Sequence, residues 1–576
     1  MKKILYIIVA GSLFMISSCS EDFLDTTNLY ETSLENFYQT PQDIAEAMGG
    51  VYNALYVSGV HSEEHLAANL LADYMFGGGG PDDISAKNVA SFIDPSEDTY
   101  RDLWIETYNG VYRANAIIEA VSENDYSAFF NTEADEINFV NTSLGEAHFM
   151  RGFFMYRAAR FFGGMPLINS TDAPRDVPRA TMEETFGQIA SDFLMAAQTM
   201  PAVNAANLPL SNYGHANRWV AKAYLARTYL FYTGYMTNMG NTPTDVIPLP
   251  DGGTVTKNDV IQHLVDVRDN SGYAMVSDFR NLWPYSHVNA AAGEVVLPWA
   301  ENEGLQWVGQ DGPNSAIGTG NTEVMFSLRY AFGNWEWDGG TGQKYNNRVC
   351  LFFGIRGNSM VPFGTGWGWG PIHPVFYNNW PDDDVRKHGS VLVMGDPDQA
   401  TDGYQPEQGD HETGLFNKKY TTLQHGGEEG VRGMFYYLYG WSHGDPMQLW
   451  AAQDYYYLRF SDILLMHSEL TETADGMNQV RQRAGLDPVS WSMDNLKRER
   501  LYEFAFEGIR WFDLVRWGDV ENPANNYYGV TAEVVNSGVT TTHSVNYRSE
   551  TRGLLPIPES EIRLSNDVYQ QNPGWE

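Results

Sequence analysis

Two groups of residues have the types and spacing that catalysis requires, and the first is a histidine motif. Residues 61–65 (HSEEH) match the H-x-x-E-H pattern of inverted zinc proteases. In that chemistry the two histidines lie on one helix and bind zinc with a third ligand, while Glu64 acts as the base. Ser58 and Gly59 precede the motif at an expected helix junction, and no third-ligand pattern follows. Because so short a match arises easily by chance in 576 residues, we expect solvent-facing histidines here and no metal site.

The second group is a set of glutamates four residues apart, Glu499, Glu503 and Glu507. Paired carboxylates catalyse glycoside hydrolysis only when they flank the substrate bond, which carboxylates stacked along one helix do not do. Arg500 and Arg510 are near in the chain, so we expect a salt-bridged helix face that packs against the scaffold. The sequence contains no G-x-S-x-G, Walker or Cys-x-x-Cys motif.

Aromatic residues in the middle of the chain point to binding rather than catalysis. Ten of the 16 tryptophans lie between residues 283 and 450, among many glycines. Sugars have apolar C–H faces and hydroxyl rims, so flat aromatic rings edged by polar groups suit them. Two tryptophan pairs are spaced i, i+2, which places both rings on the same face of an extended segment. The candidate platform consists of Trp335, Trp337, Trp367, Trp369, Tyr377 and Trp380, with Asn378, Asn379 and residues 382–384 as polar partners. The alternative is that these rings form the core of the region.

A second candidate site lies earlier in the chain. Asp73 precedes the four glycines of residues 77–80, and Asp82 and Asp83 follow them. Four glycines after a helical segment predict a loop, and the three carboxylates could bond sugar hydroxyls. They could equally bind Ca²⁺, which prefers oxygen ligands, or only solvate the loop. No motif is specific for a metal, so we expect no cofactor and leave a structural Ca²⁺ open.

The charge of the chain restricts its ligands. With 36 Lys and Arg against 73 Asp and Glu, the formal net charge is −37. Phosphate backbones and anionic bilayer surfaces repel such a chain, which argues against a nucleic-acid partner or charge-driven membrane binding. A polyanionic ligand would need local basic residues, for which the candidates are Arg329, Lys344, Arg348 and Arg356.

The N-terminus predicts export and lipidation. Lys2 and Lys3 precede an apolar run over residues 4–16 that is too short to span a bilayer comfortably. The run ends in Ile-Ser-Ser-Cys at residues 16–19, which resembles a bacterial lipoprotein box with Cys19 as the lipidated residue. The alternative is a plain secretory peptide that ends near a cysteine. Cys350 is the only other cysteine, so a lipidated chain has no intrachain disulfide.

Three regions follow this leader. We assign residues 1–18 to a signal peptide, 19–40 to a lipidated tether, 41–237 to an N-terminal helical region, 238–450 to a variable insertion and 451–576 to a C-terminal helical region. Apolar spacing predicts a helix that starts at Pro41, and further helices near 100–121, 142–162, 182–200 and 214–231. The insertion is rich in glycine and aromatic residues without helical periodicity, which predicts loops and short strands that carry the ligand face. The fold class expected is mainly α, a helical-repeat scaffold with a large insertion.

Several segments, taken in order, resemble one family. They are SEDFLD after the lipobox at 20–25, EAHFMRGFF at 146–154, FFGGMPL at 161–167, LRFSDILLM at 458–466, VRQRAG at 480–485, EFAFEGIRWFDL at 503–514, LLPIP at 554–558 and QNPG at 571–574. Each is weak alone, but together they are similar to the SusD/RagB family of outer-membrane nutrient-binding lipoproteins. The resemblance covers nearly the whole chain apart from the variable middle.

This resemblance implies a tetratricopeptide-like helical scaffold and a non-catalytic protein at the cell surface, lipid-anchored in the outer membrane. It further implies capture of an oligo- or polysaccharide and its delivery to a SusC-like TonB-dependent transporter. The alternative function is a surface glycoside hydrolase or another polysaccharide-active enzyme, which would share the aromatic cleft. The identity of the glycan does not follow from the sequence, because the variable loops determine it.

Overall fold

The computed structural model describes residues 37–56, 64–174, 176–289, 294–330, 347–356, 360–406, 409–427, 430–439 and 451–576. The chain is 48% helical, and its short strands form two-stranded sheets. This confirms the expected mainly α fold. In the described part of the chain, none of the helices combines the length and the apolar composition that crossing a membrane requires.

Helices make up most of the N-terminal and C-terminal parts of the chain. The N-terminal half contains α2 (Pro41–Asn53), α3 (Glu64–Leu71), α4 (Ile84–Ala90), α5 (Arg101–Glu123), α6 (Glu133–Phe162), α7 (Met182–Thr199), α8 (Arg218–Asn238) and α9 (Lys257–Asn270). The C-terminal part contains α15 (Phe460–Thr471), α16 (Asp475–Arg483), α17 (Met493–Glu503), α18 (Arg510–Arg516) and α19 (Glu559–Leu564).

The elements between these two parts of the sequence are short. The helices there are α10 (Pro298–Asn302), α11 (Arg348–Phe353), α12 (Pro374–Asn379), α13 (Val385–Ser390) and α14 (Met434–Tyr439). The strands pair as β1 (Val246–Pro248) with β2 (Thr254–Thr256), β3 (Val288–Asn289) with β4 (Glu294–Val295), β5 (Val324–Leu328) with β12 (Tyr455–Arg459), β6 (Ile355–Arg356) with β7 (Thr365–Gly366), β8 (Val391–Val393) with β9 (Leu415–Asn417), β10 (Gln424–Gly427) with β11 (Gly430–Gly433), and β13 (Ala532–Asn536) with β14 (Val539–His543).

Local sequence explains where the scaffold helices begin. Thr40 and Asp43 form a reciprocal capping box at the start of α2, with Pro41 in the first turn as predicted. The helix expected from residue 142 begins at Glu133 because Thr132 caps it, and the helix expected from residue 214 begins only after the cap Asn217.

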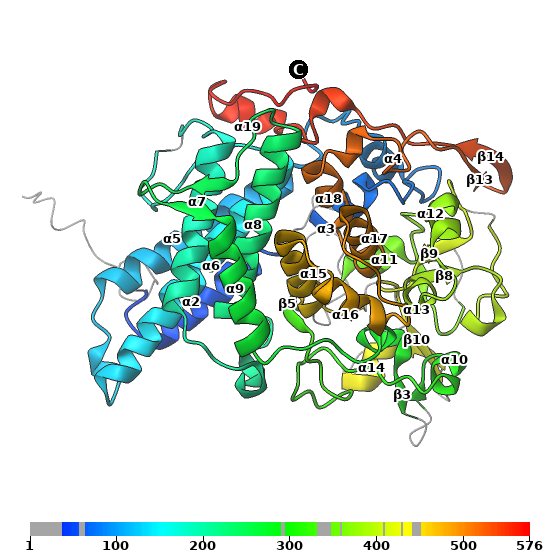
Figure 1. Ribbon diagram of the computed structural model, residues 1–576, viewed down its shortest axis with the longest axis horizontal. Coiled ribbons are helices and arrows are strands. Elements are labelled where there is room, and N and C mark those ends of the chain that lie inside the picture. Colours follow the sequence, from blue (N-terminus) through cyan, green and yellow to red (C-terminus); the bar gives the residue numbers. More distant parts are fainter. Residues whose placement is uncertain are drawn as a thin grey trace, which may run out of the picture.

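The N-terminal helices stack in chain order, each packing against the next from α5 to α9. Figure 1 shows α2 and α5–α9 on one side of the molecule, the strands β8, β9, β13 and β14 with α10, α12 and α13 on the other, and α15–α17 between them. Successive helices stacked in this way are the tetratricopeptide-like scaffold that the sequence predicted.

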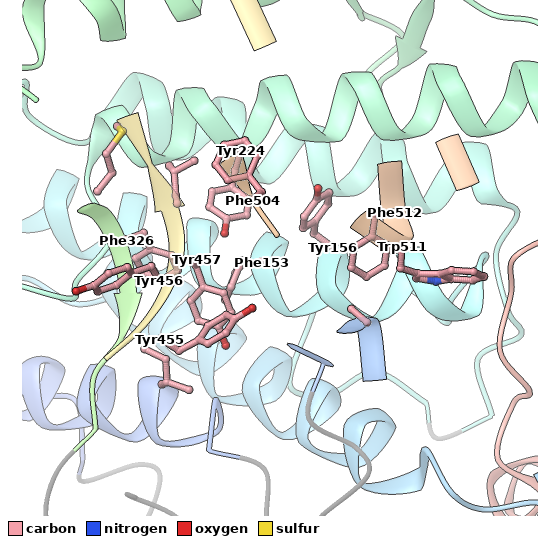
Figure 2. Packing of buried hydrophobic residues seen from close by; sticks show 14 of the residues in the cluster. Phe153, Tyr156, Tyr224, Phe326, Tyr455, Tyr456, Tyr457, Phe504, Trp511 and Phe512 are labelled. Atoms are coloured by element: carbon pink, nitrogen blue, oxygen red, sulfur yellow. The ribbon is translucent and has the colours of Figure 1, made fainter. Parts of the chain in front are cut away.

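An aromatic core joins the N-terminal and C-terminal regions. β5 pairs antiparallel with β12, which brings Phe326 beside Tyr457. Phe153 of α6 packs edge-on against both rings, with centroids 5.2 Å from Phe326 and 5.1 Å from Tyr457 (Figure 2). One hydrophobic cluster extends from Ile44 to Ile557, so all three regions bury side chains against one another.

Candidate functional site

The glycine loop and the second tryptophan pair, which are almost 300 residues apart in sequence, lie side by side. Residues 74–79 run antiparallel to residues 368–373. The Phe76 N–H donates to the Pro371 carbonyl at 2.9 Å, and the Gly79 N–H donates to the Gly368 carbonyl at 2.8 Å. One part of each candidate site therefore lies beside the other, and we call this region the glycine-loop face (residues 77–83, 356, 367–369 and 409–412). The glycines 77–80 themselves are buried, and Asp82 is exposed.

Gly78 makes this close pairing feasible. Its φ of +68° lies in the left-handed region, where side chains are strained. A Cβ atom at Gly78 would lie 2.3 Å from Pro371 and 2.4 Å from the Gly368 carbonyl oxygen. Glycine is therefore needed both for the turn and for the contact between the two segments.

The two tryptophans of this face differ in exposure. Both ring centroids lie near that of Phe352, at 4.8 Å for Trp367 and 4.6 Å for Trp369, so the two rings share one side of their segment. The backbone between them is not extended as expected, because Gly368 has a φ of +73°. That side points inward for Trp369, whose ring stacks on Phe352 and is 1% exposed. The solvent-facing position expected of a platform is therefore not observed for Trp369. Trp367 is half-buried.

Ion pairs surround the exposed edge of the loop. Arg356 donates to Asp83 at 2.9 Å and to the Trp367 carbonyl at 3.2 Å, so it connects the loop to the tryptophan segment. Asp83 also accepts from the Gly80 N–H, while Asp82 is exposed. Opposite them, Lys87 donates to the Gly80 carbonyl and to Asp410. Sequence spacing could not find Arg356, Lys87 or Asp410 as partners, because the pairs are hundreds of residues apart.

A pair of stacked histidines contacts the glycine loop. The rings of His411 and His543 lie 3.8 Å apart and nearly parallel. The Gly78 N–H donates to Nδ1 of His411 at 3.4 Å, which requires that this nitrogen carry no proton. Burial, with His543 and Lys87 nearby, lowers the pKa of His411 to about 4. The loop thus rests on a neutral imidazole.

The other sequence candidates lie away from this edge. Asp73 is buried in a bidentate pair with Arg510, at 2.9 and 2.8 Å. Trp380 is 1% exposed, because it donates to Asp384 and stacks on Tyr502 at 4.7 Å. Tyr377 is half-buried under the Lys387 ammonium, which lies 4.3 Å from the ring centroid. Trp335, Trp337 and Cys19 lie outside the described residues.

Comparisons with known proteins agree with this architecture. A family model described as "SusD family" matches residues 372–575, and one described as "Starch-binding associating with outer membrane" matches residues 22–230. The chain belongs to the SusD family.

Three relatives of this SusD-family chain match about nine-tenths of its length. A SusD-like protein of Bacteroides ovatus is 22% identical and covers 89% of this chain and 82% of its own. Surface glycan-binding protein A from Bacteroides fluxus superposes with a TM-score of 0.67 at 21% identity, covering 92% of this chain and 99% of that one. Its counterpart from Bacteroides thetaiotaomicron, solved in complex with laminarihexaose, gives 0.66 at 17% identity, over 92% and 99%. At these identities the structural likeness establishes the shared fold.

In this SusD-family protein the three glutamates are buried in ion pairs, as the structural interpretation predicted, and Arg386 pairs with Glu499. The neighbouring arginines are not their partners, because Arg500 pairs with Asp462 and Asp513, and Arg510 with Asp73. Arg459 donates to Glu503 at 2.7 Å and to Glu507 at 2.9 Å, all of them buried. Burial alone would raise the pKa of Glu503, but Arg483 and Arg459 outweigh it and hold the pKa well below its usual range. The helix ends at Glu503, so Glu507 reaches the cluster from the following turn and not from the same helix.

The structure also places the histidine motif and the candidate basic residues. His65 is 3% exposed and stacks on Tyr455 at 4.1 Å, so the expectation of a solvent-facing side chain is wrong for it, and His61 lies outside the described residues. Within the described ranges, no group of three or more His, Cys, Asp or Glu is arranged to hold a metal ion. Arg329 pairs with Asp311 and Asp454. Arg356 is likewise paired, Arg348 opens α11, and Lys344 lies outside the described residues.

Proposed function

We propose that this SusD-family protein binds an oligo- or polysaccharide at the glycine-loop face, does not cleave it, and delivers it to a SusC-like TonB-dependent transporter in the outer membrane. The observation that carries the proposal is the meeting of the glycine loop with the Trp367 segment. This brings an indole edge beside carboxylate, guanidinium and backbone groups. An apolar ring surrounded by hydrogen-bonding groups matches the alternating faces of a sugar.

The charges of the face favour a neutral glycan. Asp83 is paired with Arg356, and Asp410 with Lys87, so each of these carboxylates already has a cation. Paired groups can still accept or donate hydrogen bonds at their free lone pairs and protons, as sugar hydroxyls require. A polyanion, in contrast, would meet no uncompensated cation among these residues and would approach a chain of net charge −37.

Glu412 is the residue that a hydrolase at this face would use. Burial raises its pKa to about 7, which is the range of a general acid. However, Glu412 is 3% exposed, and its backbone pairs with Val535 in both directions. A buried carboxyl cannot reach a glycosidic bond, and hydrolysis needs a second carboxylate about 5–9.5 Å away across the bond. This supports binding over cleavage.

The experiment is a paired assay of binding and release. The chain is run in native gels that contain laminarin, starch, xylan or mannan, and each glycan is then incubated with it and tested for new reducing ends. We expect retardation in at least one gel and no reducing ends above the rate of a boiled sample. Steady release that the Glu412→Gln variant abolishes would establish the hydrolase instead. Loss of glycan uptake when the transporter gene is deleted tests the delivery step.

A further inference from the structure

A second aromatic surface lies on the scaffold, on elements that do not contribute to the glycine-loop face. Trp104, Tyr108 and Tyr112 are spaced four residues apart on α5, so they follow one side of the helix. A rise of 1.5 Å per residue separates successive rings by about 6 Å along the axis. The usual interpretation of such a stripe is a core-facing side of the helix.

The burial of the three rings shows that only one end of the stripe is core. Trp104 is 3% exposed and contacts Phe162 and Tyr569, with centroids at 5.4 and 5.8 Å. Tyr108 is half-buried, and its hydroxyl donates to the Pro166 carbonyl at 3.0 Å. Tyr112 is 41% exposed. The stripe therefore rises from the floor of a depression to its rim.

The depression is a groove of about 540 Å³, which is within the usual range for ligand sites. The stripe forms one wall, and the loop 166–174 and the C-terminal segment around Tyr569 form the others. We call it the α5 groove. Asn109, Ser170 and Thr171 supply amide and hydroxyl groups to its lining. Glu561 is the ionisable carboxyl of the lining, and Arg101 neutralises it at 3.1 Å.

We propose that the α5 groove is a second binding site for a neutral oligosaccharide. Aromatic faces of graded exposure, bordered by uncharged polar groups, suit sugar rings with their C–H faces and hydroxyls. Glu561 is paired with Arg101, so the carboxylate of the lining presents no uncompensated negative charge to a ligand. The rest of the lining is apolar and consists of Ile105, Pro166, Ile168, Ala173 and Pro174. A peptide or protein segment is therefore the competing occupant, which the test below distinguishes from a sugar.

This inference rests on the proposed function and extends it. Two separate sites on one chain increase the retention of a long polysaccharide, because the second contact forms within a complex that already exists. A short oligosaccharide can occupy either site but gains nothing from both. The α5 groove should therefore matter more for polymers than for oligomers.

The test compares variants of the full mature chain. Tyr112→Ala removes the exposed ring, Tyr112→Phe keeps it, and Phe129→Ala removes a 51% exposed ring outside both sites. Retardation in the gel polysaccharide that wild type binds is measured, followed by titration with a hexasaccharide of the same glycan. We expect about tenfold weaker polysaccharide binding for Tyr112→Ala, and wild-type behaviour for the other two. Trp367→Ala combined with Tyr112→Ala should bind more weakly than either alone.

The outcomes separate the two proposals. If wild type binds and Tyr112→Ala binds equally well, the α5 groove is not a glycan site, while the proposed function stands. If wild type binds no glycan in the panel, both proposals fall. If Tyr112→Ala keeps its glycan affinity but loses association with the co-expressed transporter, the groove is a protein interface and the proposal is overturned. Because Tyr112 is exposed, its loss should leave the melting temperature near that of wild type.

Discussion

At the scale of single residues, the exposure of a side chain distinguishes a binding role from a packing role. Trp367 and Trp369 share one neighbour, Phe352, yet only Trp367 is partly exposed. Gly79 covers Trp369, since a Cβ atom at this glycine would lie 2.9 Å from the indole. The buried ring of Trp369 therefore stabilises the glycine-loop face, and Trp367 is the residue of the pair that can contact a ligand.

Alanine substitution should distinguish these two roles. Trp369→Ala creates a cavity in the packed face and should cost about 3–5 kcal/mol of unfolding free energy. Trp367→Ala should lower the melting temperature little but weaken glycan binding about tenfold, which corresponds to ~1.4 kcal/mol. Calorimetric melting and titration on both variants provide the measurements, with Trp367→Phe as the control that retains a ring. Full affinity in Trp367→Ala would move the binding surface elsewhere.

His411 predicts a pH dependence of the same face. Its pKa is about 4 in the folded protein, against 6.5 for an ordinary histidine, so folding favours the neutral form. The stabilising contribution is complete above pH 6.5 and is lost as the pH falls towards 4. Protonation would remove the acceptor for Gly78 and place positive charge beside His543 and Lys87.

We therefore expect the wild-type melting temperature to fall between pH 6.5 and 4 more steeply than that of His411→Asn. Asparagine tolerates the positive φ of this position, and its amide has no charge to gain. His543→Phe keeps the stacked ring and should also flatten the profile. Glu412 has the opposite effect on the pH dependence of stability. Its pKa is raised from 4.5 to about 7, so its contribution to stability is complete below pH 4.5 and is lost as the pH rises towards 7. Parallel profiles for wild type and His411→Asn would rule out this role.

At the scale of elements, the periodic pattern predicted α2 and α5–α8, and capping residues determine where α2 and α6–α8 begin. It missed α9, which lies in the segment expected to form loops and short strands. The helix from Pro41 follows directly from its apolar spacing. The pairing of residues 74–79 with 368–373 could not be predicted from the sequence. Backbone hydrogen bonds between distant segments produce no periodic pattern of residue types in a single sequence. The burial of Trp380 was hidden for the same reason, since Tyr502 is supplied by another helix. The α5 stripe was visible in the spacing, but spacing alone does not separate a core side from a groove.

The buried ion cluster around α17 should be essential for stability. Arg459 and Arg483 both donate to Glu503, which is fully buried. Both arginines also pair with Glu323, so Glu503→Gln removes one of the two carboxylates that they share. Removing one partner of a buried pair costs about 3–5 kcal/mol. Urea unfolding measures the loss. Glu533→Gln, at an exposed position of β13, is the matched control and should change stability by less than about 0.5 kcal/mol. Equal midpoints for the two variants would contradict the structural role of the cluster.

At the scale of the whole molecule, charge and anchoring determine where the chain can work. A net charge of −37 gives it no attraction to an anionic membrane surface. Retention at a membrane then depends on a covalent lipid or on a protein partner. Acyl chains contribute about 0.8 kcal/mol per buried CH₂, so more than one chain is needed for a stable anchor. A tethered chain with two glycan sites would hold a polymer close to the transporter.

Cys19 should carry this anchor. Cys19→Ala removes the acceptor in the lipoprotein box, so we expect loss of palmitate label and release of the protein from the membrane fraction. Cys350 provides an internal control because it is the only other cysteine and is buried in the core. Cys350→Ala should keep both the label and the membrane association. Metabolic labelling with fractionation makes the comparison in cells that lack the transporter, so that a protein partner cannot retain the unlipidated chain. If Cys19→Ala still carries the label, or wild type never does, the lipobox interpretation is wrong and the leader is a plain secretory peptide.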